Sequence, residues 1–411
     1  MKLISNQLSP NFTFADSMHA VGQIFCAKKN VYPQYTKIFN TENFLLTNSA
    51  RTGLTLIIQS LNLPKEKKIG IPAFICAVVA TPFLEAGYSI EWLDTDENGL
   101  ISVPDFEKKS SNISLVVVPH IFGQRAKVEK IYQIVKQNHI FVVEDGAHLF
   151  DTDYTHSDAK IFSFGREKVF SCVSGGAVIW NNKKFPVGTR HALSLPKKWW
   201  SVRHALQPLI FALALPWWRS GGKCIPAIAS QLKILPRAVT RKEKQGHEDF
   251  PLASLHSIQQ RILLRQFQNA EKTTTHRKKI AEAWKRTLEK LFPDSHIIIP
   301  KNYFRVILLT NKKRTEVLAR AKHIGFDLNE WNGIPIAPEG VNYEKFGYKS
   351  GQCPRAETYA QSYVTFPTNV RTTTRDILRF EKNYPTGKNC LSCGTCFSIL
   401  SLSEGDPDHG G

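Results

Sequence analysis

Residues Leu115–His148 read LVVVPHIFGQRAKVEKIYQIVKQNHIFVVEDGAH, and this stretch decides the fold class. Two short apolar runs, Ser114–Pro119 and Ile140–Glu144, predict strands that are buried on both faces. Between them, Val128–Gln137 has the apolar spacing of a helix. A strand, a helix and a second strand at this distance form a βαβ unit, in which the two strands run parallel in one sheet.

The same alternation extends in both directions, from Phe44 to Asn181. We therefore predict an α/β fold with a mainly parallel, seven-stranded sheet between helices. In such sheets ligands bind beyond the carboxyl ends of the strands, so the residues after each strand are the candidates for a site. The five further strands are expected at Phe44–Thr47, Lys68–Pro72, Ser89–Thr95, Lys160–Phe164 and Ala177–Trp180, and two further helices at Arg51–Leu61 and Ala77–Glu85.

Length and composition indicate an ordinary globular protein with more than one domain. The chain has 411 residues, of which 42% are apolar and 22% charged, so a disordered or fibrous protein is excluded. The net charge of +19 indicates an acidic partner, such as a nucleotide, a phosphorylated small molecule, nucleic acid or an anionic membrane. Residues 183–245 hold 13 basic residues and one acidic residue. The excess therefore belongs to one segment, and we expect no nucleic-acid binding by the protein as a whole.

The division of the chain follows from these changes in texture. We predict a large domain at 1–182, a basic Trp-rich insertion at 183–247, a smaller C-terminal α/β domain at 248–385 and a flexible tail at 386–411. The N-terminus lacks the pattern of a signal peptide, and eight cysteines are too sparse for a disulfide scaffold, so a cytoplasmic protein is expected. Within the smaller domain we expect strands at Arg305–Leu309 and Ser362–Phe366, and helices at Arg314–Gly325 and Thr374–Tyr384.

Three short segments at predicted strand ends carry chemistry that fits one ligand. SARTGL (Ser49–Leu54) opens a helix whose free N–H groups are suited to a phosphate, although Ser49 also fits a simple helix cap. EDGAH (Glu144–His148) places a carboxylate at a buried strand end, where it needs a cation, such as a protonated pyridine nitrogen, or else a structural partner. SFGREK (Ser163–Lys168) places a lysine beyond the next strand, either to form an imine with an aldehyde or as a solvated loop residue.

The order and spelling of these segments resemble the DegT/StrS-type sugar aminotransferases, which are fold-type-I enzymes that use pyridoxal phosphate (PLP). SARTGL is similar to that family's phosphate-binding helix start, EDGAH to its "EDxAQ/H" strand end, and SFGREK with the following SGGAV to its "SFxxxK…GGA" segment. CPRAETYAQSYVTFP (Cys353–Pro367) also resembles the family's "cPvAE…vLsLP". The resemblance covers roughly Phe44 to Tyr384 with gaps. It implies that residues 1–182 form a PLP-binding domain.

The resemblance implies a role for each matching residue. Lys168 bonds the cofactor and moves the proton, Asp145 holds the pyridine nitrogen protonated, and His148 lies near the ring. Ser163 binds the phosphate with the helix start at Ala50, Arg51 and Thr52. The family's aromatic ring-stacking position reads Cys76 here, so Phe74 or His148 is expected to stack instead.

By the same resemblance we expect an aminotransferase that carries an amino group from glutamate or glutamine to a nucleotide-linked keto-sugar in polysaccharide or glycan biosynthesis. A homodimer is expected, because family sites are built at a subunit interface. The family's Asn-Tyr-Arg segment is replaced by Leu252–Ser254, which leaves open a PLP-dependent sugar dehydrase or another PLP enzyme of this fold. A third hypothesis is a non-catalytic basic protein that binds a membrane surface or nucleic acid through residues 183–245.

Two segments lie outside this resemblance. An uncharged run from His204 to Trp218 has Trp pairs and basic residues at its ends, and it is shorter than the ~20 residues that span a bilayer. It predicts either a helix at a membrane surface, through residues 197–223, or a helix packed within the protein. The tail motif CLSCGTC lacks a fourth ligand unless Cys353 or His409 supplies one, so no metal is predicted for Cys390, Cys393 and Cys396.

Overall fold

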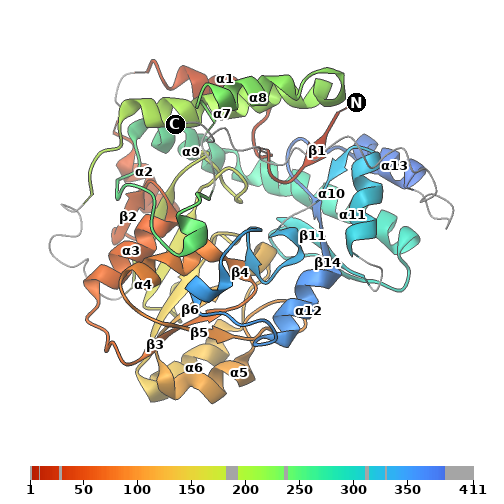
Figure 1. Cartoon of the computed structure of the whole chain (residues 1–411). Helices are drawn as coiled ribbons and strands as arrows, with labels where there is room; N and C mark the ends of the chain where they lie inside the picture. The colour runs from red at the N-terminus through yellow and green to blue at the C-terminus, as the bar shows by residue number, and fades with distance from the viewer. Residues whose placement is uncertain are drawn as a thin grey trace, which may run out of the picture.

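A seven-stranded sheet lies at the centre of the chain (Figure 1). The computed structural model describes residues 2–8, 10–26, 30–181, 193–235, 239–310, 314–328 and 331–384. Only β9 runs against its neighbours, so the sheet is mainly parallel and all seven predicted strands are confirmed. The spatial order is β2 (Phe44–Thr47), β9 (Gly176–Trp180), β8 (Ala159–Ser163), β7 (Phe141–Asp145), β6 (Ile113–Pro119), β3 (Lys68–Pro72) and β5 (Ile90–Leu93).

Helices cover both faces of this sheet, which explains why its strands are apolar throughout. Every residue of β6 is buried, and its alternate side chains enter two different cores. Val117 meets the core beneath α3 (Ala50–Ser60) and α4 (Thr81–Glu85), whereas Val116 meets the core beneath α5 (Val103–Lys109) and α6 (Val128–Asn138). Towards β2, the second face is covered by α2 (Tyr32–Phe39) and α9 (Ser257–Gln268). The α/β prediction is therefore confirmed.

A smaller antiparallel sheet follows in the C-terminal part of the chain. It consists of β10 (His296–Ile298), β11 (Arg305–Leu309) and β14 (Tyr363–Pro367). Its core contains Trp284 and Phe380, contributed by α10 (Ala270–Leu291) and α13 (Thr374–Asn383), together with side chains of α11 (Arg314–His323). The strands and helices expected here are all present. The domain boundaries remain predictions.

Two short strand pairs join distant parts of the chain. β1 (Ile4–Ser5) pairs with β12 (Phe326–Asp327), and β4 (Ile75–Cys76) pairs with β13 (Ile336–Ala337). The second pair brings residues 336–340 close to a cavity that lies at the edge of the large sheet. Other short elements are α12 (Pro354–Ser362) and the 3-10 helices η1 (Ala77–Val79), η2 (Ser110–Asn112), η3 (Ile121–Gly123), η5 (Glu243–Gln245), η6 (Trp331–Gly333) and η7 (Tyr343–Phe346).

A helical layer lies on the outside of the molecule, at the top of Figure 1. It contains α1 (Phe14–Gly22), α7 (Lys198–Ala214), η4 (Leu215–Ser220) and α8 (Cys224–Gln231). The inner side of α7 is buried against the protein, including Ala205 and Phe211, whereas Trp199 and Leu213 are exposed. The helix predicted between the Trp pairs therefore packs within the protein on one side only. Among the described helices, none has both the length and the apolar character that crossing a bilayer requires.

Candidate active site

A cavity of about 1100 Å³ lies beyond the carboxyl ends of the parallel strands. Residues that follow three strands line it: Ser49, Ala50 and Arg51 after β2, Asp145 and His148 after β7, and Ser163 and Lys168 after β8. Because β2, β7 and β8 point the same way in one sheet, their ends bring these segments together although 119 positions separate Ser49 from Lys168. Cys76, after β3, lines the same cavity.

Lys168 and His148 are in direct contact. Nδ1 of His148 accepts a hydrogen bond from the backbone N–H of Phe122 (3.1 Å), so the neutral imidazole carries its proton on Nε2. Burial, with the charges of Lys168 and Arg305, holds the pKa of His148 well below its ordinary value, which keeps the ring neutral. Nε2 lies 2.9 Å from Nζ of Lys168, which is within hydrogen-bond distance. The imidazole therefore fixes the position of the lysine amine, the group that forms an imine with an aldehyde.

Asp145 presents a buried carboxylate at the end of β7. One oxygen accepts the N–H of Ala147 (2.8 Å), and the residue is 7% exposed. Burial raises the pKa of Asp145 above its ordinary value, and the hydrogen bond from Ala147 acts against this rise. Within the described ranges, no Lys, Arg or His forms an ion pair with Asp145. The carboxylate is therefore placed to hold a cationic hydrogen-bond donor inside the cavity.

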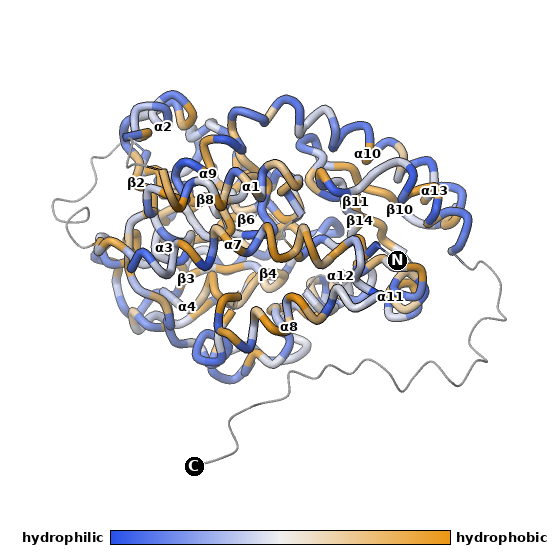
Figure 2. The backbone as a smooth tube through the Cα atoms, turned by 90° about the horizontal axis from the view of Figure 1, so that it is seen from above, coloured by the Kyte–Doolittle hydropathy of each residue, from blue (hydrophilic) through white to orange (hydrophobic). Residues whose placement is uncertain are grey.

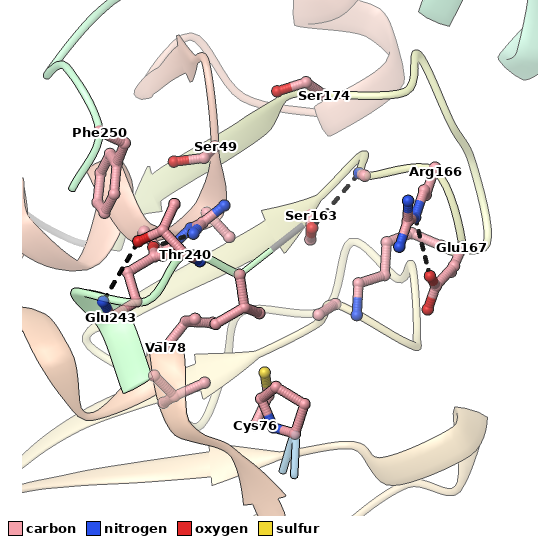
Figure 3. A pocket seen from close by; sticks show the side chains of 18 of the residues that line it. Ser49, Cys76, Val78, Ser163, Arg166, Glu167, Ser174, Thr240, Glu243 and Phe250 are labelled. Atoms are coloured by element: carbon pink, nitrogen blue, oxygen red, sulfur yellow. Dashed lines mark hydrogen bonds and ion pairs between the residues drawn. The ribbon is translucent and has the colours of Figure 1, made fainter. Parts of the chain in front are cut away.

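The start of α3 faces the cavity, which Ser49 and Ser163 also line (Figure 3). Ser49 is the N-cap, and its side chain accepts the N–H of Thr52, which leaves the N–H groups of Ala50 and Arg51 at the helix start. The chain passes very close to this turn at Gly176, where an added Cβ would lie 2.5 Å from the nitrogen of Ala50. Only glycine fits there. The helix start is thus fixed against β9, in a geometry suited to an anion.

Two of the predicted cofactor contacts do not reach the cavity. Thr52 is fully buried, and its hydroxyl donates to the side chain of Asn48 (2.6 Å). Phe74 is also fully buried, with its ring against those of Phe122, Trp331 and Tyr359. Neither residue lines the cavity, so these two expectations were wrong. Phe74 points into the sheet's core because alternate residues of an extended chain point to opposite sides.

Arg51 lines the cavity, but another residue already holds its guanidinium. Nη1 of Arg51 forms an ion pair with Glu243, whose side chain is fully buried, and the guanidinium lies over the ring of Phe250 at 4.9 Å. Glu243 is itself fixed by the backbone N–H of Thr240 (2.8 Å). Figure 3 shows Glu243 and Phe250 beside the helix start that carries Ser49. A phosphate there would share Arg51 with Glu243.

The backbone around Lys168 is held from outside the sheet. The carbonyl of Lys168 accepts a hydrogen bond from Nδ2 of Asn11, and the carbonyl of Val169 accepts one from Arg277 (2.6 Å). Arg277 also donates to Oδ1 of Asn11 (3.1 Å), which links the two contacts. Arg305 reaches the carbonyl of Glu167 at 3.4 Å. Consecutive carbonyls of this loop are thus bonded to the N-terminal segment, α10 and β11.

A buried charge network supports the other side of the site. Glu144 and Asp145 are consecutive in β7 and therefore point to opposite faces. Glu144 accepts a hydrogen bond from His120 (2.8 Å) and pairs with Lys160 (3.3 Å). Burial opposes ionisation of Glu144, but the contacts with His120 and Lys160 outweigh it and lower its pKa to about 2. His120 in turn lines the cavity, so the network supports the strand end that carries Asp145.

Comparison with known proteins agrees with this geometry. The model of the DegT/DnrJ/EryC1/StrS aminotransferase family matches residues 34–191 and 231–380, which is more than half of the chain. The chain belongs to this family. Among curated relatives, UDP-4-amino-4,6-dideoxy-N-acetyl-beta-L-altrosamine transaminase of Campylobacter jejuni is 29% identical over 33% of this chain and 39% of its own length. GDP-perosamine synthase of Escherichia coli O157:H7 is 24% identical over 38% of this chain and 46% of its own length. The chain thus spans less than half the length of these relatives.

Solved structures share the fold. Spr1654 of Streptococcus pneumoniae in its PLP form has a TM-score of 0.67 at 14% identity, over 92% of this chain and 97% of its own. The aminotransferase TlmJ of Streptoalloteichus hindustanus has a TM-score of 0.66 at 14% identity, over 93% and 98%. DesI, solved with its TDP-sugar product, has a TM-score of 0.65 at 15% identity, over 93% and 91%. These likenesses show the fold of a DegT-type aminotransferase.

The cavity of this DegT-type protein fits the cofactor that the family implies, PLP. The amine of Lys168, the buried carboxylate of Asp145 and the free helix start at Ala50 match its aldehyde, its pyridine nitrogen and its phosphate in chemical type. No cluster of His, Cys, Asp or Glu suited to a metal occurs in the described part of the chain, to which Cys353 belongs. Cys390, Cys393, Cys396 and His409 lie outside that part.

Sequence reasoning missed several residues of the cavity. Ser174 donates to the carbonyl of Asn48 (2.9 Å) beside the helix start, and Trp331 enters from the C-terminal part of the chain. Pro251 accepts a hydrogen bond from Asn48 within the same chain (2.8 Å), just before Leu252–Ser254. The serine before the Gly pair was a usable signal for Ser174. Glu243, Phe250 and Trp331 gave none, because their approach depends on long-range packing.

Proposed function

We propose that the protein is a PLP-dependent aminotransferase that moves an amino group from an amino acid, most simply glutamate, to a keto-sugar. The observation that carries this proposal is the contact between Nζ of Lys168 and Nε2 of His148, in one cavity with Asp145. Family membership supports the reaction type. The names of the Campylobacter and Escherichia relatives support a nucleotide-linked sugar as the acceptor, in glycan biosynthesis.

When bound, PLP supplies an aldehyde that bonds an amine and a ring that withdraws electrons from the bonded carbon. In this proposal Lys168 would hold the cofactor through its Nζ, and the same Nζ would move the proton at the α-carbon of the amino-acid donor. His148, neutral because of its burial, keeps Nε2–H directed at this position.

The remaining residues bind and orient. The carboxylate of Asp145 accepts the pyridine N–H, and the buried surroundings that raise its pKa also strengthen this charge-assisted bond. The amides of Ala50 and Arg51, with Ser163 opposite, hold the phosphate through the dipole and free N–H groups of α3. His148 would lie against the cofactor ring, and its own imidazole is held by stacking on Phe122 with an interplanar angle of 8°. A homodimer is part of the proposal.

The donor half-reaction tests the proposal without knowledge of the sugar. The PLP-loaded protein is mixed with glutamate and no acceptor, and released 2-oxoglutarate is measured against the enzyme concentration. We expect about one equivalent from the wild type, none from Lys168→Ala, and a strongly reduced rate from Asp145→Asn. Asp249→Asn is the matched control, because Asp249 also lines the cavity, and it should behave as the wild type. A wild type that binds PLP and releases no 2-oxoglutarate with glutamate or any other amino acid would favour the dehydrase instead.

A further inference from the structure

The exposed large apolar side chains of this protein are concentrated on one face. We define the outer helical layer as residues 13–26 and 193–235, which contain α1, α7, η4 and α8. Of the eleven exposed large hydrophobic residues in the described part of the chain, ten lie in this layer, and only Leu378 lies elsewhere. Figure 2 shows α7 and α8 side by side with mostly apolar colouring. The exposed members in residues 193–235 are Leu195, Trp199, Leu213, Trp217, Ile225, Ile228 and Leu232.

Part of the positive charge of the molecule lies in the same layer. Residues 193–235 contain Lys197, Lys198, Arg203, Arg219, Lys223 and Lys233, and no Asp or Glu. The cavity does not share this excess, because five basic and five acidic side chains line it. The basic residues of the layer are therefore not explained by an anionic substrate in the cavity. They surround exposed apolar side chains, which is the composition of a surface that binds anionic lipid.

Most of the layer lies outside the residues that the family model matches. The family model matches the chain up to residue 191 and again from residue 231. The segment between these matches contains α7, η4 and nearly all of α8.

A second copy of this chain fits the layer less well than a membrane does. A two-fold interface places the same patch against itself, so the six basic residues would face one another without an acidic partner. An anionic bilayer offers negative headgroups to these residues and an apolar interior to Trp199, Trp217 and Ile228. Because none of the described helices is able to cross a bilayer, the layer would lie in the interface.

We propose that the outer helical layer docks the protein on an anionic membrane surface. This proposal goes beyond the aminotransferase function and does not depend on it. Its consequence for that function is spatial: Trp200, His204 and Gln207 line the cavity from α7, whose outer side carries Trp199 and Leu213. The cavity then lies about one helix diameter, ~10 Å, from the docked surface.

Vesicle sedimentation tests the docking directly. The full-length protein is mixed with vesicles of phosphatidylcholine alone, or with vesicles that also contain about 30 mol% phosphatidylglycerol. The salt concentration is ~0.1 M, where the Debye length is ~10 Å. We expect binding to the anionic vesicles that weakens as salt is raised. The double variant Trp217→Ser/Ile228→Ser should lower the affinity by about tenfold or more, since both side chains are exposed and lose apolar contact with lipid. Lys198→Glu/Lys223→Glu should lower it as well.

Leu378→Ser is the matched control, because Leu378 is 65% exposed on α13, and Trp217 is 67% exposed. It should bind vesicles as the wild type does. Circular dichroism of each variant confirms folding, and Lys168→Ala should bind vesicles unchanged, which separates docking from catalysis. Failure of the wild type to bind anionic vesicles would overturn the proposal, as would full binding by the double variant. If the wild type does not bind vesicles but forms a dimer that the double variant disrupts, the layer is a contact between copies of the chain. That result would also overturn the docking proposal.

Discussion

The buried carboxylate of Glu144 should make a measurable contribution to stability. Its ordinary pKa is 4.5, and the contacts with His120 and Lys160, acting against burial, lower it to about 2 in the folded protein. A carboxyl group whose pKa falls on folding stabilises the folded state at every pH above its unfolded pKa. That contribution is lost as the pH falls through the folded pKa. At ~1.4 kcal/mol for each tenfold change in proton affinity, it amounts to about 3 kcal/mol at neutral pH.

The test is urea unfolding of the wild type and of Glu144→Gln, followed by circular dichroism. At pH 7 the variant should lose up to about 3 kcal/mol of unfolding free energy, and the difference should shrink between pH 4.5 and about 2. Glu91→Gln is the control: Glu91 pairs with Lys68 in β5, where the partners' side chains are 15% and 39% exposed. It should cost less than about 1 kcal/mol. Equal stability of Glu144→Gln and the wild type at pH 7 would refute the reasoning.

Three further substitutions probe the cavity. Gly176→Ala should weaken PLP binding by about tenfold, because the added Cβ displaces the start of α3. Gly22→Ala is the control, since there is open space around Gly22, and it should bind PLP as the wild type does. PLP titration measures both affinities. Phe74→Ala should lower the free energy of unfolding by about 3–5 kcal/mol, because it leaves a cavity in the core. The folded variant should still bind PLP. Loss of PLP binding without loss of stability would contradict the buried position of Phe74. Asn11→Ala should raise the PLP dissociation constant several-fold, because the carbonyl of Lys168 loses its hydrogen bond from Asn11. Unchanged PLP affinity would show that the loop keeps its conformation without this hydrogen bond.

The sheet was predictable from the sequence because its strands are buried on both faces. Runs such as LVVVP and FVVED have few other interpretations when a helical segment of eleven residues separates them. The candidate site was predicted from the same pattern, since the carboxyl ends of parallel strands meet at one edge. Asp145 and Ser163 end two such strands, and Lys168 lies in the loop after Ser163.

The errors and omissions have a common physical origin. The pairing of β1 with β12 joins positions more than 300 residues apart and leaves no trace in local periodicity. Arg51 was expected to help bind a phosphate, but Glu243 approaches its guanidinium from a segment that only tertiary packing brings near. Phe74 carried the right chemistry for stacking on a ring, and the direction of its side chain depended on a two-residue strand that pairs with β13.

The most direct test of the account is to find which lysine bonds the cofactor. The protein is incubated with PLP and reduced with borohydride, which fixes the cofactor on the amine that holds it, and the modified peptide is identified by mass spectrometry. The account predicts one adduct, on Lys168, that is absent in Lys168→Ala and retained in Lys244→Ala, since Lys244 is the other lysine lining the described cavity. An adduct on Lys244, or none on Lys168 at saturating PLP, would contradict it.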